Sequence, residues 1–197
     1  WRAWIYRKAV TEGAYADAIW CSVAGPVGFA IGINPDGKIG LAIDSSGGGD
    51  WDIRKGVDPG DPRGSHVIPL NTWTHIQVCR SGNTFYGFVN GEIDQTFTSS
   101  AAISNAGSGY HLGHWHDGWT RYFNGHIDDL EITVGVARNT SDFTTPGSLS
   151  PEFSGIGGNL RVTLEAVRDG HTSEQMFDHS FARAGYGLQY GNYYGGI

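Results

Sequence analysis

The sequence has few charged residues and no long apolar run. Asp, Glu, Lys and Arg make up 17% of the 197 residues, whereas about a quarter is usual for a soluble domain. The longest apolar stretches are far shorter than the roughly 20 residues that a membrane-spanning helix needs, and no charged and then apolar leader opens the chain. We therefore expect a soluble protein. The chain begins at Trp1 in what is already a strand pattern, which leaves its true N-terminus open.

Positive charge and cysteine are also scarce. The 13 Lys and Arg against 20 Asp and Glu give a formal net charge of −7, and the basic residues form no run that could follow a phosphate backbone, so nucleic acid is not an expected partner. The two cysteines, Cys21 and Cys79, lie in the apolar runs IWCSV and IQVCR. Buried free thiols are common in such runs. Free thiols are favoured over a disulfide, although two strands could bring the cysteines together.

Glycine and aromatic residues are abundant, with 31 Gly and 13% aromatics. Tight turns between short strands, with aromatic residues in a core between two sheets, give this profile. Hairpins are predicted at residues 34–37, NPDG, and at Asn90-Gly91, because both combine turn residues with flanking strand-like runs. No 3.6-residue period occurs before residue 160. The pattern predicts an all-β, antiparallel sandwich.

The composition changes after Pro151. We predict a β-sandwich over residues 1–150 and a Gly- and Tyr-rich C-terminal extension over residues 151–197. The extension contains a flexible joint, SGIGG, one strand-like run, LRVTLEAV, and a terminal Gly/Tyr segment of low complexity. It has too few apolar residues for a core of its own. It should therefore pack on its own domain or on a neighbouring subunit.

Several motifs occur in a characteristic order between residues 71 and 146. WTHIQV, RSGN and FVNG lie within residues 73–91, HLG occupies residues 111–113, and RYFNGHIDDLEI occupies residues 121–132. Together they resemble laminin-G-like, concanavalin A-like lectin/glucanase domains, whose fold is an antiparallel jelly roll. GVARNTSDFTTP, residues 135–146, resembles an extension found especially in bacteriophage tail, fibre and surface proteins.

This resemblance implies a non-enzymatic structural protein of a bacteriophage virion. It would be a tail, fibre or capsid decoration component at the particle surface, and it could contact host-surface glycans. Its partners would be other virion subunits or further copies of itself, bound through the C-terminal extension. The alternative is an extracellular carbohydrate-binding module of a secreted or surface protein. A β-jelly-roll glycoside hydrolase is a minor alternative.

Tryptophans in two Gly- and Asp-rich regions are candidate glycan contacts. Trp51 lies in the long loop 44–66, and Trp115 and Trp119 lie in the cluster HLGHWHDGW together with His114 and His116. Indole faces stack on sugar rings, and histidines could supply polar contacts. Packing or subunit contact is the alternative. A zinc site lacks a fourth ligand at a diagnostic spacing.

Asp128 is the candidate metal ligand. With regular strand alternation it shares a face with Leu130 and Ile132, so its carboxylate should point inward and needs partners. Two solutions exist: hydrogen bonds to loop amides, or a structural Ca²⁺ held with backbone carbonyls, as in many jelly rolls of this type. No cofactor is required.

Glu92 and Asp94 are the carboxylates that would support an enzyme. Jelly-roll hydrolases resembling laminarinases carry Glu-x-Asp-x-x-Glu on a strand. Here Phe97 occupies the third position after Asp94, and the pair directly follows the Asn90-Gly91 turn, at a hairpin edge. No G-x-S-x-G motif is present. We therefore expect no catalytic residues.

Overall fold

Strands account for all regular structure in the described part of the chain. The computed structural model describes residues 1–10, 17–22, 28–47, 51–56, 64–103, 109–115 and 122–147, and the backbone of residues 158–168 and 171–181. None of these residues forms a helix that could cross a membrane. The strands are β1 (Arg2–Arg7), β2 (Asp17–Ser22), β3 (Phe29–Ile33), β4 (Ile39–Ile43), β5 (Ile53–Lys55), β6 (Trp73–Ser81), β7 (Thr84–Val89), β8 (Glu92–Thr98), β9 (Tyr110–Leu112), β10 (Gly125–Val134), β11 (Gly158–Arg168) and β12 (His171–Phe181).

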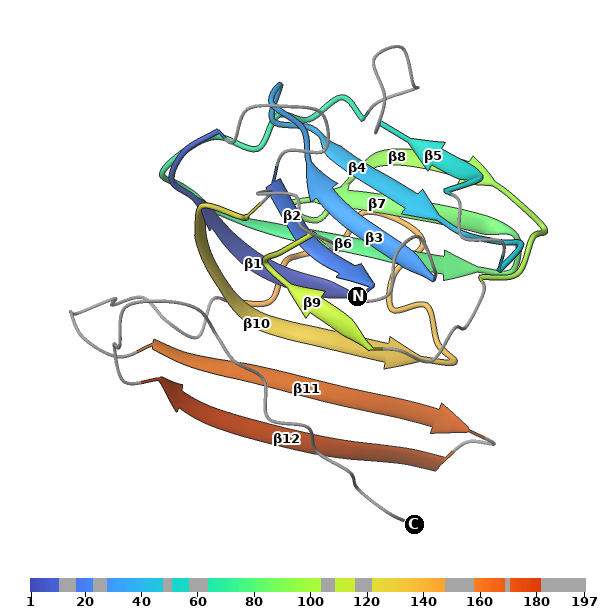
Figure 1. Ribbon diagram of the computed structural model, residues 1–197. Coiled ribbons are helices and arrows are strands. Elements are labelled where there is room, and N and C mark those ends of the chain that lie inside the picture. Colours follow the sequence, from blue (N-terminus) through green and yellow to red (C-terminus); the bar gives the residue numbers. More distant parts are fainter. Residues whose placement is uncertain are drawn as a thin grey trace.

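The strands form two stacked sheets (Figure 1). The seven-stranded sheet has the order β12-β11-β10-β1-β6-β7-β8, and the five-stranded sheet has the order β5-β4-β3-β2-β9. Every pairing is antiparallel except that between β10 and β11. The predicted antiparallel jelly-roll sandwich is confirmed. The strand-like run LRVTLEAV lies in β11, which extends the sheet beyond β10 (Figure 1).

The core lies between the two sheets because strand alternation directs one row of each strand inward. In β3 and β4 this inward row consists of Phe29 and of isoleucine and leucine, which suit a pleated buried surface. The outward positions of the same strands carry only alanine and glycine: Ala30, Gly32, Gly40 and Ala42. The main inward residues, all 3% exposed or less, are Ile5, Ile19, Ile31, Ile33, Ile39, Leu41, Ile43, Ile76 and Phe85.

Both predicted hairpins are present. Gly37, between β3 and β4, has a φ of 83°, and Asn90 and Gly91, between β7 and β8, have φ values of 50° and 84°. Two successive positive φ values match the twist of antiparallel strands. Gly91 has a second role, because a Cβ at this position would collide with the backbone oxygen of Phe143.

The cysteines lie in different sheets, Cys21 in β2 and Cys79 in β6, and both are free thiols. The favoured assignment of free thiols agrees with this arrangement.

The alternation expected around Asp128 is wrong. The register of β1 with β10 shifts between Arg2 and Trp4, which pair with Glu131 and Asp128. Asp129 has a φ of 48°, and the extra residue of this bulge reverses the alternation. Leu130 is buried in the core, whereas Asp128 lies beside Trp4 on the opposite face.

A buried ion pair joins the two sheets. Arg7, the last inward residue of β1, donates from Nε to Oδ2 of Asp17, the first residue of β2, over 2.6 Å. The two side chains are 2% and 0% exposed. The Arg7 guanidinium also donates to the backbone oxygen of Asn34 over 3.0 Å. The ion pair therefore crosses the sandwich and reaches the β3–β4 turn.

We expect Arg7→Met to lower the free energy of unfolding by about 3–5 kcal/mol, because removing one partner leaves the other charge buried. Arg2→Met is the matched control. Glu131, the partner of Arg2, keeps Arg138, so this change should cost about 1 kcal/mol or less. Urea unfolding of both variants measures the difference, and equal losses would contradict the role of the buried pair.

Candidate functional site

Four aromatic side chains lie together on the outer face of the seven-stranded sheet. They are Trp4 and Tyr6 of β1, Trp73 of β6 and His126 of β10, and we call them the aromatic patch. Because Ala3 and Ile5 fill the inward row of β1, the alternate residues Trp4 and Tyr6 must face outward. Tyr6 is directly opposite both Trp73 and His126 in the strand register.

All four residues of the patch are half-buried, and the rings of Tyr6, Trp73 and His126 contact one another. The Tyr6 ring centroid is 5.5 Å from that of Trp73 and 5.8 Å from that of His126, and Trp73 and His126 are 6.4 Å apart. The rings are tilted relative to one another. Burial, together with the positive charge of Lys8, lowers the pKa of His126. Neutral imidazole is therefore favoured in the patch.

Polar groups border the patch on the side of Trp4. Asp128, opposite Trp4 in the register, accepts a hydrogen bond from the backbone N–H of Asp129 over 2.9 Å. Burial raises the pKa of the Asp128 carboxyl. The indole Nε1 of Trp4 is buried and has no hydrogen-bond partner among the described residues. A carboxylate acceptor thus lies beside the patch, and the patch itself contains a buried indole N–H without a partner in the described part of the chain.

His75 extends the aromatic row beneath a covering segment. Its ring centroid lies 5.4 Å from that of Trp4 and 5.8 Å from that of Phe143, with edge-to-face geometry at both contacts. Only 1% of His75 is exposed, and neither ring nitrogen has a hydrogen-bond partner in the described part of the chain. Burial, assisted by the charge of Arg2, lowers the pKa of His75 to about 4. The imidazole is therefore neutral at pH 7.

The covering segment is residues 135–147, which we call the strap. It leaves the end of β10 and crosses the outer face towards the β7–β8 turn. The Cys79 thiol donates to the backbone oxygen of Asn139 over 2.9 Å, and the backbone N–H of Phe143 donates to the oxygen of Gly91 over 2.9 Å. Phe143 also packs edge-on against buried Phe88. The strap thus covers the part of this face next to the patch.

A family model described as the concanavalin A-like lectin/glucanases superfamily matches residues 1–139, more than half of the chain. The chain belongs to this superfamily. The resemblance seen in the sequence is confirmed. Among solved structures, a protein from Bacteroides ovatus, described as a proposed carbohydrate-binding protein, is similar with a TM-score of 0.44 and 14% identity. The similarity covers 64% of this chain and 34% of that one, so the chain spans about a third of that relative. No curated protein matches the chain.

Two of the predicted glycan contacts of this concanavalin A-like domain, Trp51 and Trp115, lie over the five-stranded sheet. Trp51 and Trp115 meet with ring centroids 5.9 Å apart, and they are only 7% and 6% exposed. They cluster with Ala18, Ala30 and Ala42. Both residues were predicted from the sequence as glycan contacts, but in the structure their indole rings pack against the sheet. Their role in glycan binding stays a prediction.

His111, in β9, and His114 lie near the same sheet. The His114 ring stacks on Tyr122 at 4.6 Å and meets His111 edge-on at 5.1 Å. Trp119 and His116 lie outside the described residues. Their predicted contacts are therefore untested.

The described side chains at Asp128 do not form a calcium site by themselves. Asp129 is the neighbouring carboxylate whose charge helps to raise the pKa of Asp128. Within the described ranges, no group of three His, Cys, Asp or Glu side chains comes together to bind a metal ion, whereas Ca²⁺ takes six to eight oxygen ligands. A calcium role for Asp128 stays a prediction.

Glu92 and Asp94 both contact His66, a partner that the sequence did not indicate. Glu92 Oε2 lies 3.1 Å from His66 Nε2, and Asp94 Oδ1 lies 3.1 Å from His66 Nδ1. Asp94 also accepts the backbone N–H of His66 over 2.7 Å. Alternate residues of β8 thus attach the segment at Gly64 to His66 to the sheet edge. The geometry gives both carboxylates a structural role.

The aromatic patch was not among the binding residues predicted from the sequence. The sequence pattern that indicates an aromatic sheet face is the spacing of two residues between Trp4 and Tyr6 and between Trp73 and His75. These pairs come from strands about 70 residues apart in the sequence, so only the strand order could place them side by side.

We expect acid to destabilise the protein through His75. The unfolded chain takes up this proton near pH 6.5 and the folded chain near pH 4, so the stability contributed by neutral His75 is complete above pH 6.5 and is lost as the pH falls towards 4. The loss between pH 7 and pH 4.5 should be about 2–3 kcal/mol larger for the wild type than for His75→Phe. Urea unfolding at both pH values measures this. Parallel losses in the two proteins would contradict the assignment.

Proposed function

We propose that this chain is a non-catalytic carbohydrate-binding module and that the aromatic patch is its binding surface. The observation that supports this most directly is the outward-facing group of Tyr6, Trp73 and His126 on one sheet face. Rings held on paired strands are rigid, so they lose little conformational entropy when a sugar ring stacks on them. The Asp128 carboxylate beside them can accept hydrogen bonds from sugar hydroxyls.

The absence of catalysis is part of this proposal. Glycoside hydrolases use two carboxyl groups that flank a sugar, one as acid and one as nucleophile or base. In β8, Asp94 is 8% exposed and both Asp94 and Glu92 are bound to His66. This arrangement favours a structural clamp over a substrate-facing pair. The proposal would fail if the chain hydrolysed a glycan and Glu92→Gln abolished the hydrolysis.

Trp73→Ala should weaken glycan binding about tenfold or more, because a buried stacking ring is worth at least about 1.4 kcal/mol. Tyr6→Phe should retain most of the affinity, since the ring remains. A glycan array identifies a ligand for the wild-type chain, and calorimetry then compares the variants.

Trp115→Ala is the control for the other sheet. If it abolishes binding while Trp73→Ala does not, the binding surface lies over the five-stranded sheet, at Trp51 and Trp115, and the patch is excluded. Circular dichroism of each variant checks that the fold is retained.

As the setting of this module we propose the surface of a bacteriophage virion, as a tail, fibre or capsid decoration component. The similarity of residues 135–146 to an extension typical of such proteins supports it. A second support is the position of β12, which is an edge strand of the seven-stranded sheet. No described strand pairs with its outer edge, and an edge strand can pair with another chain. Further copies of this chain or other virion subunits would be the partners.

Assembly through the extension predicts that the full chain is larger than a monomer in solution. A chain ending at residue 150 should then be monomeric, because it lacks β11 and β12. Light scattering after size-exclusion chromatography measures both masses. A full chain that stays monomeric at the highest soluble concentration would contradict the assembly proposal and leave glycan binding unaffected.

A further inference from the structure

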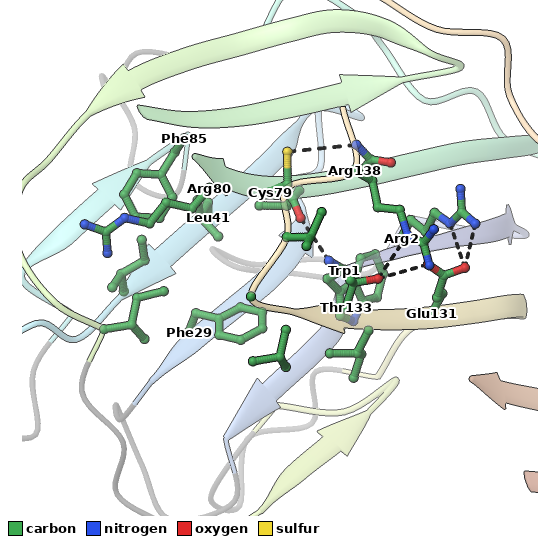
Figure 2. A pocket seen from close by; sticks show the side chains of 18 of the residues that line it. Trp1, Arg2, Phe29, Leu41, Cys79, Arg80, Phe85, Glu131, Thr133 and Arg138 are labelled. Carbon is green, nitrogen blue, oxygen red and sulfur yellow. Dashed lines mark hydrogen bonds and ion pairs between the residues drawn. The ribbon is translucent and has the colours of Figure 1, made fainter. Parts of the chain in front are cut away.

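A cavity of about 410 Å³ opens at one end of the sandwich. Its wall combines side chains of both sheets, among them Phe29 and Leu41 from the five-stranded sheet and Val78 and Phe85 from the seven-stranded sheet (Figure 2). This volume lies within the range of roughly 300–1,000 Å³ that is usual for small-molecule sites. The cavity is separate from the aromatic patch, none of whose residues lines it.

The rim of the cavity contains exposed apolar side chains. Val134 and Val136 line it and are 63% and 47% exposed. Both belong to the segment where β10 passes into the strap. An apolar wall that continues to an apolar rim favours a ligand with an apolar body.

Charged groups at the rim are mainly positive. The described lining includes the guanidinium groups of Arg2, Arg80 and Arg138 and one carboxylate, that of Glu131. Arg2 and Arg138 share this carboxylate, at 2.5 and 2.7 Å. Among the described residues, Arg80 donates to backbone oxygens, those of Gly82 and Ser99. Two positive charges are thus in excess, although the whole chain carries a net charge of −7.

Two buried polar atoms of lining residues lack a partner. The indole Nε1 of Trp1 and the Oε1 of Gln77 have no hydrogen-bond partner among the described residues, and Gln77 is 1% exposed. Buried polar groups without a partner are uncommon and costly. An oxygen-bearing ligand would give the Trp1 indole an acceptor, whereas the Gln77 oxygen needs a donor, which a carboxylate does not supply.

We infer that this cavity binds an anionic amphiphile, with an apolar tail between the sheets and a carboxylate at the arginine-lined rim. The ligand class is that of a medium-chain fatty acid. A sugar fits less well, because its hydroxyls would be buried against apolar walls without partners. A cationic amphiphile would be repelled by the excess of guanidinium groups.

The first experiment varies the charge of the ligand. Dodecanoate and dodecylammonium are titrated into the full chain below their micelle-forming concentrations and followed by calorimetry. We expect saturable binding of dodecanoate with a Kd at least about tenfold lower than that of dodecylammonium, which corresponds to about 1.4 kcal/mol. Equal affinities, or no saturable binding of dodecanoate, would overturn the inference.

The second experiment varies the charge of the rim. Val136→Glu should weaken dodecanoate binding about tenfold, whereas Val136→Lys should retain or strengthen it. Val67→Glu is the matched control, since Val67 is an exposed valine that does not line the cavity, and it should leave the affinity unchanged. If Val136→Glu and Val136→Lys weaken binding equally, or if neither does, the carboxylate does not lie at this rim. Thermal melting confirms that each variant is folded.

Discussion

The buried ion pair of Arg7 and Asp17 constrains the whole sandwich. A charge without its partner in this interior would cost several kcal/mol, so β1 and β2 can stack only where the two groups meet. That position fixes which residues of β1 face the core. A shift of β1 by one residue would exchange its faces: Arg7 would leave its partner, and Trp4 and Tyr6 would enter the core. The aromatic patch therefore depends on a contact on the other side of its own sheet.

The sequence predicts the fold well because the informative signals are local. Asn90-Gly91 and the turn ending at Gly37 each specify a hairpin by their own conformational preferences, and both appear with positive φ values. Alternating isoleucines in β3 and β4 specify a buried face without reference to any other strand. Motifs that resemble those of the superfamily indicate the antiparallel jelly roll. Each of these signals depends on residues that are neighbours in the sequence.

The candidate site was less predictable because it depends on contacts between distant segments. Asp128 left its expected face because one residue, Asp129, takes a positive φ and interrupts the alternation. Trp51 and Trp115 are conspicuous in the sequence, yet their exposure depends on what they pack against. His66 reaches Glu92 and Asp94 from a segment about 26 residues earlier. Tryptophan and carboxylate side chains mark candidate positions, but the pairing of strands decides which of them share a surface.

The row of alanine and glycine on the outer side of β3 and β4 limits which residues this face of the protein can accept. Trp115 lies against Ala30, Gly32, Gly40 and Ala42 with a cavity of only about 10 Å³ between them, and a Cβ at Gly32 would approach the backbone oxygen of Asp17 to 3.2 Å. Larger residues in this row would lift the tryptophan and disturb the strand that carries Asp17. Natural variants should therefore keep small residues in this row.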